Sequence, residues 1–270
     1  MSSDEAPLPA SDAAPLALRD RATILTYSAL IAVAIAAWVY VVAGTRDSPD
    51  MTMDAMAPAA LTLRGGVAFV ASWGVMMAAM MLPSALPMIA LYGAIQRKAT
   101  HADAKGAPVA VFTLAYLVVW AATGVPVYLG SVFFDDLAVD VVPYGVALVL
   151  IAAGLFQLSA LKHVCLRTCR SPLGFLLGHW RAGYRGSLAL GLAHAAYCVG
   201  CCWALMVVLV AAGAMGLAWV LAIAAIVAAE KVAPGGEWIA RVTGGALMLL
   251  GVLVALRPDL VTMLRGAHGM

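Results

Sequence analysis

Charged residues are scarce in this sequence, since Asp, Glu, Lys and Arg make up only 11% of its 270 residues. Soluble domains carry about 25% of such residues. Apolar residues account for 64% instead, and the mean hydropathy is +0.97. The scarcity of charge excludes an ordinary soluble domain, and no basic surface is evident from which we would expect nucleic-acid binding. We predict an all-α, polytopic helical membrane protein.

Signals for several common activities are missing too. The sequence has no G-x-x-x-x-G-K-[ST] phosphate loop and no soluble segment large enough to hydrolyse ATP, so any transport would be passive or ion-coupled. It has no quinone or haem signature. Its cysteines number five, an odd count, and avoid the segments expected outside, which argues against a structural disulfide framework. The first apolar run is too long for the core of a cleavable signal peptide.

Seven apolar runs follow one another along the chain, each near the ~20 residues that cross a bilayer as a helix. They are residues 24–44, 67–89, 109–132, 141–160, 187–210, 217–229 and 242–256. We therefore predict a transmembrane domain over 23–257, between a disordered cytoplasmic tail, 1–22, and a short C-terminal tail, 258–270. Residues 171–186 mix aromatic, apolar and basic residues in a stretch too short to span, which is typical of an interfacial helix.

The distribution of Lys and Arg predicts the orientation of these spans. With the N-terminus in the cytoplasm, 12 of the 16 basic residues fall inside. Those that fall outside are Arg46, Arg64, Arg257 and Arg265. Because positive residues accumulate in cytoplasmic loops, we predict seven spans with the N-terminus inside and the C-terminus outside, in the bacterial inner membrane.

Segment 191–206, GLAHAAYCVGCCWALM, gathers soft metal ligands in the middle of an apolar run. At about 100° per residue, His194, Cys198 and Cys201 fall within roughly 60° of one another on a helix, and Cys202 lies at the flank. Thiols and imidazole suit Cu(I), Zn(II) and Fe rather than Mg or Ca. We predict the main metal site here. The alternative is that these cysteines are small apolar residues that membrane helices bury without consequence.

Methionines line two adjacent rows of the second apolar run. The rows are Met76 with Met80 and Met77 with Met81. Prolines 83 and 87 follow them and are expected to kink the helix. A soft-metal path that completes the central site through Met76 or Met80 is one interpretation, and the filling of irregular gaps between helices is the other.

A cysteine pair follows the fourth apolar run on the predicted cytoplasmic side. Cys165 and Cys169 have the i, i+4 spacing that directs both thiols to one side if the helix continues through them. Lys162, Arg167 and Arg170 surround the pair, and positive charge favours the thiolate that binds metal. Two reduced cytosolic cysteines without a role are the alternative.

Two further features bear on metal handling. The first outer loop contains Met51, Met53 and Met56, thioethers that suit Cu(I) capture unless they reflect only the methionine-rich composition. The sixth run ends in Glu230 and Lys231, side chains that at a helix end most often extend to the interface. Glu230 would instead serve as a proton or cation partner if it faced the bundle interior.

Three motifs together give the sequence a family resemblance. They are WGVMMAAMMLP at 73–83, CLRTCRSPLGFL at 165–176 and GLAHAAYCVGCCWALM at 191–206. With AEKVAPGG at 229–236, they resemble a bacterial family of predicted metal-binding integral membrane proteins, one of the numbered families of unknown function, over about 59–256. Ala195 departs from the pattern, in which a glycine follows the histidine, and this bears on helix packing rather than on the ligands. The resemblance implies a membrane fold and a metal, without a defined substrate.

Three functions follow as alternatives from the sequence. The first is a non-enzymatic protein that binds a soft transition metal for transport, transfer or metalloprotein assembly, with a metallochaperone or metalloprotein partner. Cu(I) is favoured over Zn(II) or another transition metal because thioethers are good ligands for Cu(I). The second is a membrane thiol-disulfide oxidoreductase, since Cys198 and Cys201 have C-x-x-C spacing. The third is a non-catalytic membrane scaffold subunit with inert cysteines.

Overall fold

The computed structural model describes residues 21–47, 62–99, 107–134, 141–181, 183–211 and 217–261. Within these ranges every regular element is an α-helix, which confirms the all-α prediction. The helices are α2 (Arg21–Asp47), α4 (Leu63–Ala99), α5 (Ala107–Ala122), α6 (Gly124–Phe134), α7 (Val142–Gln157), α8 (Ala160–Arg170), α9 (Pro172–His179), α10 (Gly183–Ala211), α11 (Leu217–Val232) and α12 (Gly236–Leu256).

Several helical stretches are long and apolar enough to cross a bilayer. They are Tyr27–Gly44, Leu63–Gln96, Pro108–Gly130, Gly183–Ala211 and Gly236–Leu256, with α7 and α8 as a sixth candidate if the bent pair counts as one span. The described chain thus has five or six candidate spans, compatible with a membrane protein. The sixth predicted span, 217–229, corresponds to α11, whose 16 residues are fewer than the ~20 that cross a bilayer.

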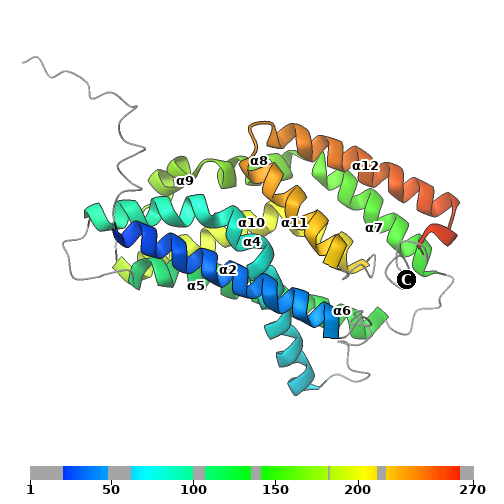
Figure 1. Cartoon of the computed structure of the whole chain (residues 1–270). Helices are drawn as coiled ribbons and strands as arrows, with labels where there is room; N and C mark the ends of the chain where they lie inside the picture. The colour runs from blue at the N-terminus through cyan, green and yellow to red at the C-terminus, as the bar shows by residue number, and fades with distance from the viewer. Residues whose placement is uncertain are drawn as a thin grey trace, which may run out of the picture.

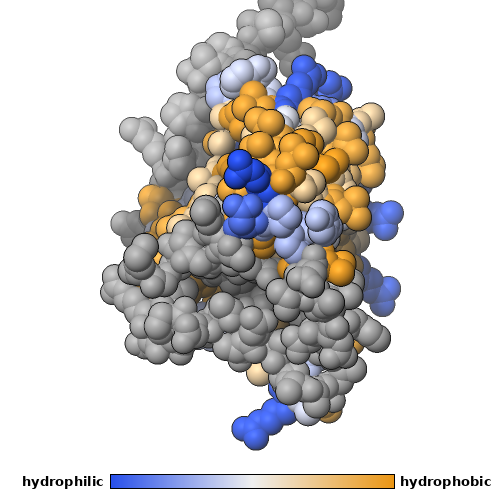
Figure 2. All heavy atoms as spheres, turned by 90° about the vertical axis from the view of Figure 1, so that its right-hand side faces the viewer, coloured by the Kyte–Doolittle hydropathy of each residue, from blue (hydrophilic) through white to orange (hydrophobic). Residues whose placement is uncertain are grey.

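Apolar side chains cover much of the described surface, as expected for helices in contact with lipid. Leu25, Ile35 and Val39 on α2 are 69%, 58% and 62% exposed. Figure 2, which looks onto one end of the bundle, shows extensive apolar surface with hydrophilic residues in separate patches. Exposing so many apolar side chains to water would be costly, whereas in a bilayer the lipid chains contact them.

Two predicted spans are interrupted. The third apolar run forms α5 and α6, separated at Thr123. The fourth run does not continue straight into the Cys165/Cys169 segment, because α7 ends at Gln157 and α8 begins at a bend of 61°. Ser159 caps the new helix by accepting a hydrogen bond from the backbone N–H of Lys162, which explains locally why a second helix starts there.

α4 is the longest helix in the described chain, with 37 residues, and contains Pro83 and Pro87. Figure 1 shows that α4 changes direction along its length. A proline inside a helix removes a backbone hydrogen bond and collides with the preceding turn, so the change of direction has an identifiable cause. α4 packs mainly against α2, α5 and α11.

α10 occupies the middle of the molecule and packs against α5, α7, α8 and α11. α7 pairs closely with α12 beside it (Figure 1). The main hydrophobic cluster includes the cysteines of α10 and the buried methionines of α4. Residues from α4, α5, α8 and α11 therefore meet around α10.

The short α9 occupies the segment predicted as an interfacial helix. Phe175 and Leu176 are buried, whereas Leu173 and Leu177 are 53% and 73% exposed, so the helix has one covered and one open side. The tail before residue 21, the Met51, Met53 and Met56 loop, and the chain after residue 261 lie outside the described residues.

Candidate metal centre

Two glycines bring neighbouring helices close to the cysteines of α10. A Cβ on Gly191 would lie 2.5 Å from the backbone oxygen of Phe112 on α5. A Cβ on Gly200 would lie 2.9 Å from Sγ of Cys165 on α8. Because any larger side chain would collide with its neighbour, these glycines let α5 and α8 pack directly on the cysteine-bearing helix.

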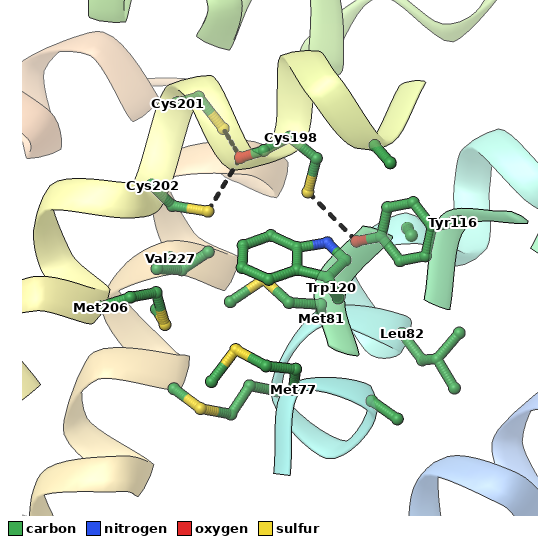
Figure 3. Packing of buried hydrophobic residues seen from close by; sticks show 14 of the residues in the cluster. Met77, Met81, Leu82, Tyr116, Trp120, Cys198, Cys201, Cys202, Met206 and Val227 are labelled. Carbon is green, nitrogen blue, oxygen red and sulfur yellow. Dashed lines mark hydrogen bonds between the residues drawn. The ribbon is translucent and has the colours of Figure 1, made fainter. Parts of the chain in front are cut away.

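The three cysteines of α10 are each 1% exposed. The thiols of Cys201 and Cys202 donate to the backbone oxygen of Cys198 at 3.1 and 2.9 Å. In the view of Figure 3 the side chains of Cys198 and Cys202 extend toward the indole ring of Trp120, with Met81 and its neighbours on the other side of that ring. The thiols are thus gathered in a dry interior lined by sulfur and aromatic groups.

Cys198 has polar partners from two other helices. Oη of Tyr116, on α5, lies 3.1 Å from Sγ of Cys198 (Figure 3). Nζ of Lys231, on α11, donates to the same sulfur at 2.9 Å. The sulfur of Cys198 therefore has two polar neighbours although it is buried, unlike a thiol that only fills apolar space.

Lys231 was not expected in the site, because a base at the end of an apolar run most often extends to the interface. That expectation was wrong: Lys231 is only 8% exposed. Its Nζ also lies 3.3 Å from Oγ of Ser84 and 3.8 Å from Sδ of Met81, both on α4. The signal available in the sequence was an ionisable residue next to an apolar run, which in a membrane protein is a functional candidate by default.

The cysteines of α8 adjoin those of α10. Sγ of Cys169 lies 3.9 Å from Sγ of Cys201. Cys165 is 8% exposed and packs against Gly200. The two cysteine motifs, which the sequence placed in separate parts of the chain, therefore form one contiguous group of thiols between α8 and α10.

His194 is buried among aromatic rings rather than beside a hydrogen-bonding partner. Its ring stacks on Phe112 and Tyr116 and meets the edge of Phe175, with centroid separations of 5.9, 5.5 and 5.6 Å. Its Nδ1 has no hydrogen-bond partner in the described part of the chain. The histidine lies one turn from Cys198 on α10, so its predicted role as a ligand stays a prediction.

The methionine rows of α4 face the core. Met77, Met80 and Met81 are at most 2% exposed, and Met76 is half-buried against the same cluster. It is Met81, rather than Met76 or Met80, whose sulfur shares the neighbour Lys231 with Cys198. Of the two rows, the one formed by Met77 and Met81 is thus connected to the thiol of Cys198, through Lys231.

Glu230 is also buried, and it contacts other helices than Lys231 does. Its carboxylate accepts hydrogen bonds from Lys162 at 2.6 Å and from Gln157 at 2.8 Å. The two charged side chains are 0% and 2% exposed. Nη1 of Arg170 donates to the backbone oxygen of Glu230 at 2.6 Å. The alternative in which Glu230 faces the interior therefore holds, and its partner is a lysine.

Across the described ranges, no group of three or more His, Cys, Asp or Glu side chains is arranged around a single metal position. The sulfur donors lie in two pairs: Cys169 and Cys201 are 3.9 Å apart, whereas Met81 and Cys198 each contact Nζ of Lys231. Sulfur donors of this kind match Cu(I), which accepts low coordination numbers, better than they match Mg or Ca.

The family model of PpoB2, described as a copper chaperone, matches residues 70–254 of the chain. The matched range begins in α4, ends in α12 and includes every cysteine of the chain. Neither the comparison with curated proteins nor that with solved structures gives a match. The match agrees with the resemblance to a metal-binding bacterial family, although it does not bear on the numbered-family name. Because it covers well over half of the sequence, this chain belongs to the PpoB2 copper chaperone family.

Proposed function

We propose that the protein is a membrane-embedded Cu(I) chaperone that binds copper on the thiols of α10 and passes it through α8. Cys198 and Cys201 are the principal ligands, and Cys202 or a methionine of α4 completes the site. Met81 is the favoured methionine because it shares Lys231 with Cys198. Soft sulfur donors in a water-excluded interior stabilise Cu(I) rather than a hard cation.

One observation carries the proposal: the 3.9 Å contact between the sulfurs of Cys201 and Cys169. Copper held by Cys201 can gain Cys169 as a ligand before it leaves its first ligands, so transfer needs no free ion in the low-dielectric interior. Releasing a bare cation there would be costly. Cys165, packed one turn away on α8, is the next thiol in this direction.

The remaining features of the proposal come from the charge distribution. Seven spans with the N-terminus inside place α8 at the cytoplasmic end, among most of the basic residues. Copper would then pass between the thiols and a cytoplasmic metallochaperone or metalloprotein partner. The sequence has no phosphate loop that would bind ATP. In this proposal copper therefore moves down its own gradient or is coupled to the movement of another ion.

Copper analysis of the purified full-length protein tests the proposal. We expect stoichiometric Cu(I) with a sulfur-dominated shell and metal–sulfur distances near ~2.3 Å by X-ray absorption. The Cys198→Ser/Cys201→Ser variant should lose high-affinity binding, whereas Cys165→Ser should bind copper and slow only its transfer to a soluble acceptor. Full copper retention in the double variant, or an oxygen-dominated shell, would contradict the proposal.

The Cys169–Cys201 contact also favours a second candidate, a thiol-disulfide oxidoreductase. The two thiols would pass two electrons and two protons to a disulfide of a substrate protein by thiol–disulfide exchange and so form a Cys169–Cys201 disulfide, which an external dithiol would reduce again. Reversible oxidation of this pair in a protein that binds no metal would support the oxidoreductase. A protein that neither binds metal nor shows reversible oxidation of this pair would instead favour the function of a scaffold subunit.

A further inference from the structure

Lys231 places a positive charge where a copper chaperone would place its metal. Its Nζ lies 2.9 Å from Sγ of Cys198, 3.8 Å from Sδ of Met81 and 3.3 Å from Oγ of Ser84. These contacts come from α10 and α4, so the ammonium is held between two helices that both carry candidate copper ligands.

No carboxylate in the described ranges lies within ion-pair distance of Lys231. The ion pairs recorded there are Lys162 with Glu230 and Arg167 with Glu237. The carboxylate of Glu230, the adjacent residue, is engaged instead by Gln157 on α7 and Lys162 on α8. A buried ammonium without a carboxylate partner is expensive in a membrane, so the sulfur-rich cradle must itself supply a large part of the stabilisation.

We propose that Lys231 is a built-in stand-in for copper: its ammonium occupies the cradle between Cys198 and Met81 when copper is absent, and Cu(I) displaces it on binding. This inference rests on the proposed function, because it needs copper to bind at Cys198. At Cys198 one positive charge then replaces another, and each ligating thiol that still carries a proton releases it as Cu(I) binds.

Displacement follows from electrostatics and is permitted by the position of Lys231. An ammonium and a copper ion bound to the same sulfur repel each other, and the repulsion is strong where the dielectric constant is low. Lys231 is the penultimate residue of α11, which ends at Val232. Its long apolar stem can therefore carry the charge toward the end of the helix, as lysines near membrane interfaces commonly do.

The returning ammonium also favours copper release. Because it competes with Cu(I) for the sulfur of Cys198, it lowers the affinity of the site and refills the cradle once copper has moved to Cys169. A chaperone needs this property, since a site that binds too tightly does not deliver its cargo. Without the ammonium, the same sulfurs would hold copper more strongly and transfer it more slowly.

Cu(I) titration of Lys231→Leu against a competing chelator tests the inference. Leucine keeps an apolar side chain and removes the charge without adding a thioether, which would itself bind Cu(I). We expect Cu(I) binding to tighten about tenfold or more, the scale of removing one unit charge near the metal in a medium of intermediate dielectric constant. Transfer to a soluble acceptor should slow in proportion, and Lys231→Arg, which keeps the charge, should not tighten binding.

Amine labelling of the wild-type protein provides a second test that does not depend on the folding of a variant. Acetylation at Lys231, measured by mass spectrometry, should be slow without copper and several-fold faster with bound Cu(I). Lys162, fully buried in its pair with Glu230, is the internal reference and should stay protected in both states.

The outcomes separate the two proposals. Stoichiometric copper with unchanged labelling of Lys231 and unchanged affinity in Lys231→Leu would overturn the stand-in role and leave the copper site intact. A wild-type protein that binds no Cu(I) would overturn both. Tighter binding in Lys231→Leu together with copper-dependent labelling would support both.

Discussion

Single side chains decide the chemistry at the centre of this molecule. The sulfur of Cys198 meets the hydroxyl of Tyr116 and the ammonium of Lys231, whereas the thiols of Cys201 and Cys202 bond to the backbone of their own helix. The three neighbouring cysteines of α10 thus have different surroundings despite equal burial. We expect them to differ in their roles in metal binding for that reason.

Replacing Met81 by leucine tests the contribution of one thioether. Leucine has a similar volume and no sulfur, so packing should be largely kept while one soft donor is lost. We expect Cu(I) affinity to fall by about tenfold, the effect of losing a supporting group at other metal sites. Chelator competition measures the change. Met88→Leu, at an equally buried position further along α4, is the control and should leave affinity unchanged.

At the scale of the helix, α11 takes part in two polar interactions with different neighbouring helices. Glu230 connects it to α7 and α8, and Lys231 connects it to α4 and α10. Adjacent residues on a helix point about 100° apart, which lets one turn contact both sides of the bundle. The end of α11 thereby ties the helix bearing Cys169 to the helix that carries Met81.

The Glu230→Gln substitution should destabilise this junction strongly. The variant leaves the ammonium of Lys162 buried without its carboxylate, and removal of one partner of a buried pair costs about 3–5 kcal/mol. Thermal unfolding in detergent should show the loss. Glu237→Gln removes the exposed partner of Arg167, whose side chain is 70% exposed, and should cost no more than about 1 kcal/mol. Equal losses in the two variants would show that the buried pair does not stabilise the junction.

Close packing of α7 on α12 depends on glycine. A Cβ on Gly154 would lie 2.7 Å from the backbone oxygen of Gly244, whereas one on Gly145 would meet nothing within 4 Å. We expect Gly154→Val to force the helices apart and to destabilise the protein by about 1–3 kcal/mol. Gly145→Ala should be tolerated. Urea or thermal unfolding compares the two variants, and a fully stable Gly154→Val would contradict this account of the pairing.

For the whole molecule, the orientation in the membrane is the main prediction still to be tested. The apolar runs predict seven spans, and the distribution of Lys and Arg predicts that the C-terminus lies outside. An alkaline phosphatase fusion at the C-terminus should therefore be active, because the enzyme folds only in the oxidising compartment. A fusion at Arg97 should be inactive. The reverse pattern would invert the orientation, and activity at both sites would mean a different number of spans.

The sequence by itself determined the helical class, the apolar stretches and the gathering of three cysteines on one side of a helix. These properties are local, since hydropathy and a period of 3.6 residues can be read from neighbours in the chain. The residues 198, 201 and 202 share a side because of their spacing, whatever packs against them. Met77, Met80 and Met81, which belong to the two methionine rows, are buried, in agreement with their helical spacing.

Only the tertiary structure decided which groups meet at the thiols. Lys231 reaches the sulfur of Met81 across 150 residues of sequence, and Cys169 reaches Cys201 across 32. These contacts depend on the 61° bend before α8 and on which side of α11 faces α4, and neither can be read from a local apolar pattern. Helices in lipid are equally apolar on many sides, so the packing of small residues and buried polar groups, rather than hydropathy, selects their neighbours.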